Sequence, residues 1–255
     1  MGRSPEPSLT NPWAGGPPPP LLDLDGAALF LDLDGTLAPL AARPSDVGPD
    51  PRRSALLRAL VARMDGRVAI LSGRTLAEID RILDASVQAV AAVHGLDRRV
   101  QGTDHSPPIG HPALELVTTA FRALAATRPG LLVEAKGQST ALHYRLAPDA
   151  AGAALALAER LAAETGLGLQ PGHMVIELRG PGPDKGDSLR NFMQTPPFLG
   201  AIPIVVGDDL TDEPAFVAAH SLGGFGVLVG APRPCAATYG LPDVDAVLSW
   251  LEAAL

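Results

Sequence analysis

The chain has 255 residues, 46% of them hydrophobic and 19% charged, which suits one large α/β domain or a core domain that carries a smaller one. Its formal net charge of −8 gives no overall attraction to nucleic acid or to an anionic membrane, so we expect neither as a partner. The single cysteine excludes an intrachain disulfide, and no apolar run has the ~18 residues of a membrane-spanning helix.

Residues 1–24 are rich in proline and glycine, which predicts a disordered or extended tail. The tail has no apolar signal segment, so we expect a cytoplasmic protein, and we expect a monomer. Short apolar runs then alternate with helical patterns. The predicted strands are 28–31, 68–71 and 89–93, and the predicted helices are 52–64 and 75–83. This alternation predicts a doubly wound α/β fold around a mostly parallel sheet.

The pattern changes between residues 107 and 180. A helix, a strand pair, a helix and a second strand pair are predicted there, at 111–127, 131–135 with 140–146, 148–165, and 167–170 with 173–178. The α/β pattern then resumes, with helices at 185–193, 211–219 and 244–255 and strands at 202–206 and 226–229. We therefore predict a core domain of residues 25–106 and 181–255, interrupted by an inserted α+β domain of residues 107–180.

Polar residues follow the predicted core strands at their carboxyl ends, where ligand sites of open parallel sheets lie. These residues are Asp32, Ser72, His94 and Asp208. Asp34 leaves the first strand on the same face as Asp32, because side chains alternate along a strand. Such a carboxylate pair can act as a nucleophile and a general acid, or it can bind a metal ion.

Lysine is scarce in this chain: only two of the 20 basic residues are lysine, Lys136 and Lys185. A planar guanidinium cannot easily replace a compact ammonium, so both lysines are candidates for site chemistry. A carboxylate that attacks a phosphate meets like-charge repulsion, which a lysine and a divalent cation would offset. Asp208 and Asp212 add carboxylate ligands for a hard cation such as Mg²⁺.

Four short motifs resemble those of phosphatases of the haloacid dehalogenase (HAD) superfamily. They are FLDLDGTL at 30–37, LSGR at 71–74, Lys185-Gly186, and GDDLTD at 207–212. The resemblance implies that Asp32 is phosphorylated and that Asp34 protonates the leaving sugar oxygen and then activates water. It also implies that Ser72 hydrogen-bonds the phosphoryl oxygens and that Lys185 balances their charge.

The same resemblance implies a bound Mg²⁺ ion. Its expected ligands are Asp32, the backbone carbonyl of Asp34, and Asp208. Asp212 would act on the ion through water, and Asp209 would orient the ligands. A second DxDG sequence begins at Asp23, but it follows a proline run and lacks the threonine, so Asp32 is the expected nucleophile.

The inserted domain resembles the cap of trehalose-6-phosphate phosphatases. The resemblance rests on VEAKGQSTALHYR at 133–145, on VIELR at 175–179 followed by DKG at 184–186, and on GDDLTDE at 207–213 followed by Ala215-Phe216. It runs from about residue 27 to residue 255. It implies hydrolysis of trehalose 6-phosphate, the last step of trehalose biosynthesis.

The cap resemblance also implies which residues bind the sugar. Glu134, Lys136 and Glu177 would bind the glucose ring far from the phosphate. Arg74 and His94 would contribute to substrate binding where the core meets the cap. Three further residues, His143, Tyr144 and Arg145, could contact substrate or could be structural.

Two other functions remain open at this point. One is a phosphatase of another sugar phosphate, of the sucrose phosphate or mannosyl type, because related caps serve those substrates. The other is a non-catalytic sugar-phosphate sensor on the same fold. The complete set of catalytic residues argues against a sensor, which need not keep a nucleophile and acid pair.

Overall fold

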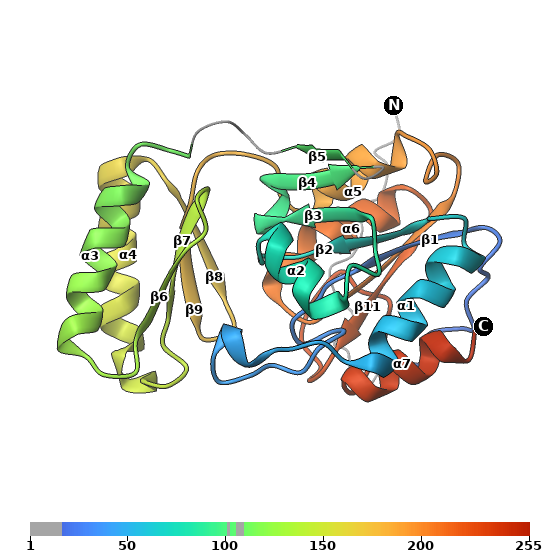
Figure 1. Cartoon of the computed structure of the whole chain (residues 1–255), viewed down its shortest axis with the longest axis horizontal. Helices are drawn as coiled ribbons and strands as arrows, with labels where there is room; N and C mark the ends of the chain where they lie inside the picture. The colour runs from blue at the N-terminus through green and yellow to red at the C-terminus, as the bar shows by residue number, and fades with distance from the viewer. Residues whose placement is uncertain (1–16, 101–102, 106–109) are drawn as a thin grey trace, which may run out of the picture.

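The computed structural model describes residues 17–100, 103–105 and 110–255, which form two sheets (Figure 1). The larger sheet has the strand order β12-β11-β10-β1-β2-β3-β4-β5, and the smaller sheet has the order β6-β7-β9-β8. The predicted fold class is confirmed: a mostly parallel sheet within an α/β core is accompanied by a separate antiparallel sheet.

The larger sheet supplies the carboxyl ends at which polar residues gather. Its strands are β1 (Ala27–Leu31), β2 (Val68–Leu71), β3 (Ala89–Ala92), β4 (Asp97–Val100), β5 (Thr103–His105), β10 (Ile202–Gly207), β11 (Phe225–Val229) and β12 (Tyr239–Leu241). All neighbours from β12 to β3 pair in parallel, whereas β4 and β5 continue the sheet as antiparallel strands. The sequence pattern did not predict β4, β5 or β12, because β4 is polar and the other two are very short.

Helices cover both faces of the larger sheet, as a doubly wound fold requires. They are α1 (Pro51–Arg63), α2 (Leu76–Leu83), α5 (Lys185–Met193), α6 (Glu213–Ser221) and α7 (Val244–Glu252). Leu29 and Leu31 of β1 pack on the face covered by α1, α2 and α7. Phe30, between them, packs on the opposite face with α5 and α6. Because both faces are covered, β1 is apolar throughout, which is typical of a buried parallel strand.

The smaller sheet is antiparallel and carries helices on one face. Its strands are β6 (Leu132–Ala135), β7 (Ser139–His143), β8 (Gly168–Gly172) and β9 (Val175–Arg179), and its helices are α3 (Leu114–Thr127) and α4 (Ala151–Thr165). Leu142 and Ile176 pack under these helices with Phe121 and Ala154. Figure 1 shows α3 and α4 on the side away from the larger sheet, so the bare face of the smaller sheet points toward the core.

The ends of the predicted domains are only partly within the described residues. Leu22 and Leu24, within the predicted tail, are buried in the core, whereas residues 1–16 lie outside the described part. The expected boundary between residues 106 and 107 also lies outside it. Among the helices that the structure describes, none combines the length and apolar character needed to cross a bilayer.

Candidate functional site

Asp32 is buried at the carboxyl end of β1, where its backbone N–H donates to Val206 of β10 over 2.9 Å. The chain then turns at Gly35, which has φ +85, a conformation that glycine adopts without strain. A Cβ at this position would also overlap the carboxylate of Asp208. Glycine is therefore needed here for two reasons: the turn, and the close approach of the Asp208 carboxylate, which follows β10.

Lys185 provides the positive charge beside Asp32. It is the first residue of α5, whose start is fixed by a reciprocal capping box between Asp184 and Asp187. The Lys185 Nζ donates to Asp32 Oδ1 at 2.7 Å and to Asp212 Oδ1 at 2.6 Å, and all three side chains are buried. One ammonium thus links the strand that carries the expected nucleophile to the loop that follows β10.

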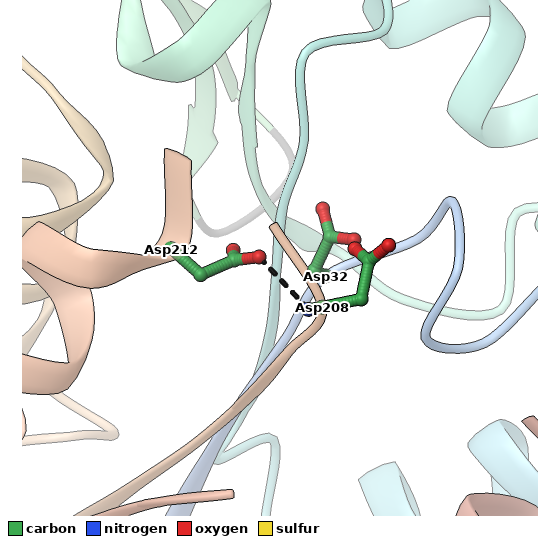
Figure 2. Close-up of side chains that lie close together, drawn as sticks. All are labelled: Asp32, Asp208 and Asp212. Carbon is green, nitrogen blue, oxygen red and sulfur yellow. Dashed lines mark hydrogen bonds between the residues drawn. The ribbon is translucent and has the colours of Figure 1, made fainter. Parts of the chain in front are cut away.

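Three carboxylates meet at this point. Asp32, Asp208 and Asp212 each offer one oxygen, and these oxygens lie within 4.8 Å of one another (Figure 2). The backbone N–H groups of Asp208 and Asp209 donate to Asp212 Oδ2, each at 3.1 Å, which fixes that carboxylate. Such a set of hard oxygen donors fits a divalent cation of the Mg²⁺ type.

The charges of this cluster are incompletely balanced. Burial raises the pKa of Asp32 to about 7, an effect that Asp212 increases and Lys185 partly offsets. Burial, with Asp32 and Asp212, raises the pKa of Asp208 to about 9. Burial alone would lower the pKa of Lys185, but the Asp212 and Asp32 carboxylates raise it above its usual range. A cation bound between the carboxylates would supply the missing positive charge.

Asp34 lies beside the cluster and is held by an arginine. Arg74 Nε donates to Asp34 Oδ2 at 2.6 Å, and Arg74 Nη2 donates to Asp34 Oδ1 at 2.7 Å. The backbone N–H of Arg74 donates to the buried Ser72 Oγ at 3.2 Å. The short turn after β2 therefore joins the expected phosphate-binding serine to the expected general acid.

The bare face of the smaller sheet presents a row of side chains to the core. Strand register aligns Glu134 with Ala141, Ala141 with Glu177, and Glu177 with Gln170. Residues aligned in this way point to the same face of a sheet. The small Ala141 leaves space between the two glutamates. His143 lies two residues further along β7, and its Nε2 is 2.8 Å from Glu134 Oε2.

Lys136 connects this row to the core. Its Nζ donates to Glu177 Oε2 at 3.1 Å and to the backbone oxygen of Gly73 at 2.9 Å. His94, with a left-handed backbone φ of 56, lies with its Nε2 3.4 Å from the same Glu177 oxygen. A Cβ on residue 73 would lie 2.6 Å from His94 Nε2, so a larger residue than Gly73 would displace the His94 ring.

The carboxylates of the smaller sheet are well compensated. Although burial alone would raise the pKa of Glu177, Lys136 and His94 hold it well below its usual range. Burial alone would also raise the pKa of Glu134, but His143 and Lys136 lower it. Burial lowers the pKa of His94. Lys136 and the two histidines, His94 and His143, compensate the two glutamates, and these groups can exchange hydrogen bonds with a neutral ligand.

One pocket between the two sheets brings the expected residues together. Its walls include Asp32, Asp34, Ser72, Arg74, His94, Glu134, Lys136, Glu177, Lys185, Asp208 and Asp209. Asp212 is buried behind Lys185 rather than in the wall. The roles of these residues remain predictions, but their placement around one cavity agrees with a shared site.

Some contacts in the pocket had no clear sequence signal. Arg145 donates to the backbone oxygens of Ala41 in the core and His173 in the β8–β9 turn. Asp209 Oδ2 accepts from the His173 backbone N–H at 2.9 Å. Residues 40–44 also line the pocket, and the backbone oxygens of Ala41 and Pro44 accept hydrogen bonds from Arg145 and Arg74. Contacts to backbone atoms leave no chemical pattern in the sequence.

Comparison with known proteins relates this chain to a family of enzymes. The family model described as trehalose-phosphatase matches residues 30–245. The trehalose-6-phosphate phosphatase of Escherichia coli strain K12 is 37% identical over 227 residues, which cover 88% of this chain and 85% of that protein.

Solved structures share the fold. A trehalose-6-phosphate phosphatase related protein matches with a TM-score of 0.75 and 27% identity, covering 89% of this chain and 96% of the other. The C-terminal domain of the C. albicans trehalose-6-phosphate phosphatase matches with a TM-score of 0.81 and 23% identity, covering 96% and 99%. At that identity, the second match supports the fold alone.

Proposed function

The chain belongs to the trehalose-phosphatase family, and we propose that it hydrolyses trehalose 6-phosphate to trehalose and phosphate, the last step of trehalose biosynthesis. One observation carries the proposal: a single pocket has a carboxylate–lysine centre on one wall and a row of sugar-binding groups on the other. The first wall suits phosphoryl transfer and the second suits a neutral sugar. A phosphorylated sugar needs both.

In the proposed reaction, a carboxylate oxygen of Asp32 attacks phosphorus while the bond from phosphorus to the sugar oxygen breaks. The electron pair of that bond goes to the sugar oxygen, which takes a proton from Asp34. Water then attacks the phosphorus of the aspartyl phosphate, and Asp34 removes its proton. Phosphate leaves and the Asp32 carboxylate is restored.

Two core residues support these steps. Lys185, hydrogen-bonded to Asp32 at 2.7 Å, offsets the repulsion between the nucleophile and the phosphate. The buried Ser72 hydroxyl would donate to a phosphoryl oxygen. Both groups are fixed before substrate arrives, so they need little rearrangement when charge moves in the transition state.

We also propose that Mg²⁺ is the cofactor. Asp32, Asp208 and the Asp34 carbonyl would bind it, with Asp212 acting through water and Asp209 orienting the loop. When bound, the ion would neutralise phosphate charge and so favour attack by a carboxylate. The cluster of three carboxylate oxygens within 4.8 Å and their hard donor chemistry support this assignment.

On the other wall, residues 107–180 would act as the cap. Glu134, Lys136 and Glu177 would hydrogen-bond the hydroxyls of the glucose ring remote from the phosphate, with His94 beside them. A sugar that lacked matching hydroxyls would leave buried polar atoms of these groups without hydrogen-bond partners, which is the physical basis of selectivity. We also propose a cytoplasmic monomer that binds no nucleic acid; the net charge of −8 argues against nucleic acid, and the single cysteine suits a reducing compartment.

The test is phosphate release from a panel of substrates with Mg²⁺: trehalose 6-phosphate, sucrose 6-phosphate, glucose 6-phosphate and a mannosyl phosphate. We expect the highest kcat/KM for trehalose 6-phosphate and loss of release on chelation. Equal rates across the panel would overturn the substrate assignment. Tight binding of a sugar phosphate without any release would instead favour a sensor.

A further inference from the structure

Arg74 directs most of its hydrogen bonds to the protein, although the resemblance of the sequence to the family implied a role in binding substrate. A guanidinium has five N–H donors. Two of them reach the two carboxylate oxygens of Asp34, at 2.6 and 2.7 Å. Two further bonds from Nη1 reach the Pro44 oxygen at 2.9 Å and Glu78 Oε1 at 3.3 Å. At most one donor remains for a ligand.

The surroundings of Arg74 fix the guanidinium itself. Its side chain is only 7% exposed. Glu78 is held in turn by the capping box of α2, in which its other oxygen accepts from the Thr75 N–H at 3.1 Å and the Thr75 hydroxyl at 2.7 Å. Pro44 ends the segment 40–44 that lines the pocket and begins a short 3-10 helix, Pro44–Asp46. Arg74 is therefore clamped between a helix start and a loop before it reaches Asp34.

This clamp acts on the carboxylate that must exchange protons with the substrate. The Asp34 side chain is 30% exposed and has no other side-chain hydrogen bond among the described residues. A bidentate pair fixes the plane of a carboxylate, and each oxygen keeps a second lone pair free. Proton transfer depends on such placement, since small displacements of a catalytic group are costly in rate.

We propose that Arg74 is a positioning residue that aims the Asp34 carboxylate at the leaving oxygen and then at the attacking water. This inference rests on the proposed function, because it assigns a task within that reaction. It makes Glu78, Arg74 and Asp34 one chain of contacts that starts in the capping box of α2. Lysine could not replace Arg74 fully, because a single ammonium cannot pair with both oxygens in one plane.

A substrate with a good leaving group separates positioning from binding. 4-Nitrophenyl phosphate releases nitrophenolate as a stable anion, so phosphorylation of Asp32 needs no proton from Asp34. Hydrolysis of the aspartyl phosphate still needs Asp34 as the base. With rapid mixing, the first turnover gives a burst of nitrophenolate at the rate of phosphorylation, and the steady state follows hydrolysis of the intermediate.

For Arg74→Ala we expect a nitrophenolate burst within about threefold of the wild-type phosphorylation rate, followed by a steady state about 10- to 100-fold slower. The decrease is part of the ~10²–10⁴-fold that general acid–base catalysis supplies. With trehalose 6-phosphate, which needs the proton in the first step, kcat should decrease by a similar factor with little change in KM. Arg74→Lys should recover part of the loss.

Three results would overturn the inference. A KM that rises at constant kcat would assign Arg74 to phosphate or sugar binding. A burst that slows as much as the steady state would indicate a purely structural role. An Arg74→Ala loss that persists undiminished in an Asp34→Asn background would show that the two residues act independently.

The controls keep the result independent of folding and of the proposed function. The burst rate constant does not depend on the fraction of folded enzyme, and the burst amplitude measures that fraction, so the steady-state rate is expressed per active enzyme. Arg145→Ala removes another arginine of the same pocket, one that contacts Ala41 and His173 but not Asp34, and should not separate burst from steady state. If wild-type enzyme releases no phosphate from any substrate, the proposed function fails rather than the role of Arg74.

Discussion

The buried carboxylates on the two walls of the pocket have opposite pKa shifts. The core wall carries Asp32 and Asp208, and the cap wall carries Glu134 and Glu177. On the core wall, burial raises the pKa of Asp32 to about 7 and that of Asp208 to about 9. On the cap wall, despite similar burial, neighbouring cationic groups hold the pKa of Glu134 and Glu177 below the usual value. The acids are alike, so the difference comes from the number of positive groups within reach.

This contrast indicates what each wall lacks. The three core carboxylates have one lysine, Lys185, among them, so they still need positive charge. A bound metal ion would supply it. The cap glutamates already have Lys136 and histidine partners, so they need only neutral hydrogen-bonding groups such as sugar hydroxyls. The core wall, which lacks positive charge, thus suits the phosphate group together with a metal ion. The cap wall, whose glutamates already have partners, suits the neutral sugar.

The largest expected effect is on the core wall, where Asp32→Asn should remove turnover. We expect kcat to fall by at least ~10⁴-fold with both trehalose 6-phosphate and 4-nitrophenyl phosphate, because the covalent step is lost. Phosphate release and circular dichroism measure activity and folding together. Asp23→Asn is the matched control: it changes an exposed aspartate of the other DxDG sequence and should leave activity unchanged. Substantial activity in folded Asp32→Asn enzyme would refute the assignment of the nucleophile.

A smaller and more selective loss is expected on the cap wall. Lys136→Met removes the ammonium bonded to Glu177 and to the Gly73 oxygen. A hydrogen bond to a charged group contributes about 1.5–3 kcal/mol, so kcat/KM for trehalose 6-phosphate should fall about 10- to 100-fold. The fall for 4-nitrophenyl phosphate, which has no glucose ring, should be clearly smaller. Equal losses for both substrates would remove the distinction between the walls.

Metal binding should distinguish the walls through stability. At a Mg²⁺ concentration of 100 times Kd, binding adds about 2.7 kcal/mol to the free energy of unfolding, or about 5–10 °C in Tm for a chain of this length. Differential scanning calorimetry with and without Mg²⁺ measures the shift. Asp208→Asn should reduce it, whereas Glu134→Gln, which removes a cap carboxylate, should keep it. A shift that depends on Glu134 and not on Asp208 would contradict the proposed metal site.

The smallest expected effect concerns acid stability. Because the pKa of Glu177 is lower in the folded protein than the usual 4.5, its contribution to stability is present above about pH 4.5 and is lost as pH falls further. Urea unfolding at pH 6 and at pH 4 should show a smaller pH-dependent loss in Glu177→Gln than in the wild type. An identical pH dependence would mean that the Lys136 and His94 pairs do not stabilise the charged glutamate.

Much of the core wall could be predicted because its residues follow strands directly. Asp32 and Asp208 come immediately after apolar runs, and parallel strands end at one edge of a sheet, so sequence order implies proximity in space. The helix predicted at 75–83 also follows from a local pattern: α2 spans Leu76–Leu83, and a capping box between Thr75 and Glu78 fixes its start. Local patterns of this kind carry their own geometry.

Other features depend on contacts that no local pattern describes. The pairing of Arg74 with Asp34 joins residues 40 positions apart, and the same arginine could equally have faced the substrate. Arg145 meets the backbone of Ala41, which has no distinctive side chain. Strand β4 (Asp97–Val100) has the polar sequence DRRV, which does not resemble a buried strand, so its pairing with β3 could not be predicted.

The contacts of the cap with the core also bear on how products leave. Lys136 bonds to Gly73, Arg145 to Ala41, and the His173 N–H to Asp209, so the cap is fastened to three separate core segments around the pocket. We expect a disaccharide product to leave only after these bonds open. The residence time of trehalose would then depend on how the cap detaches, a process distinct from the breaking of the phosphate ester.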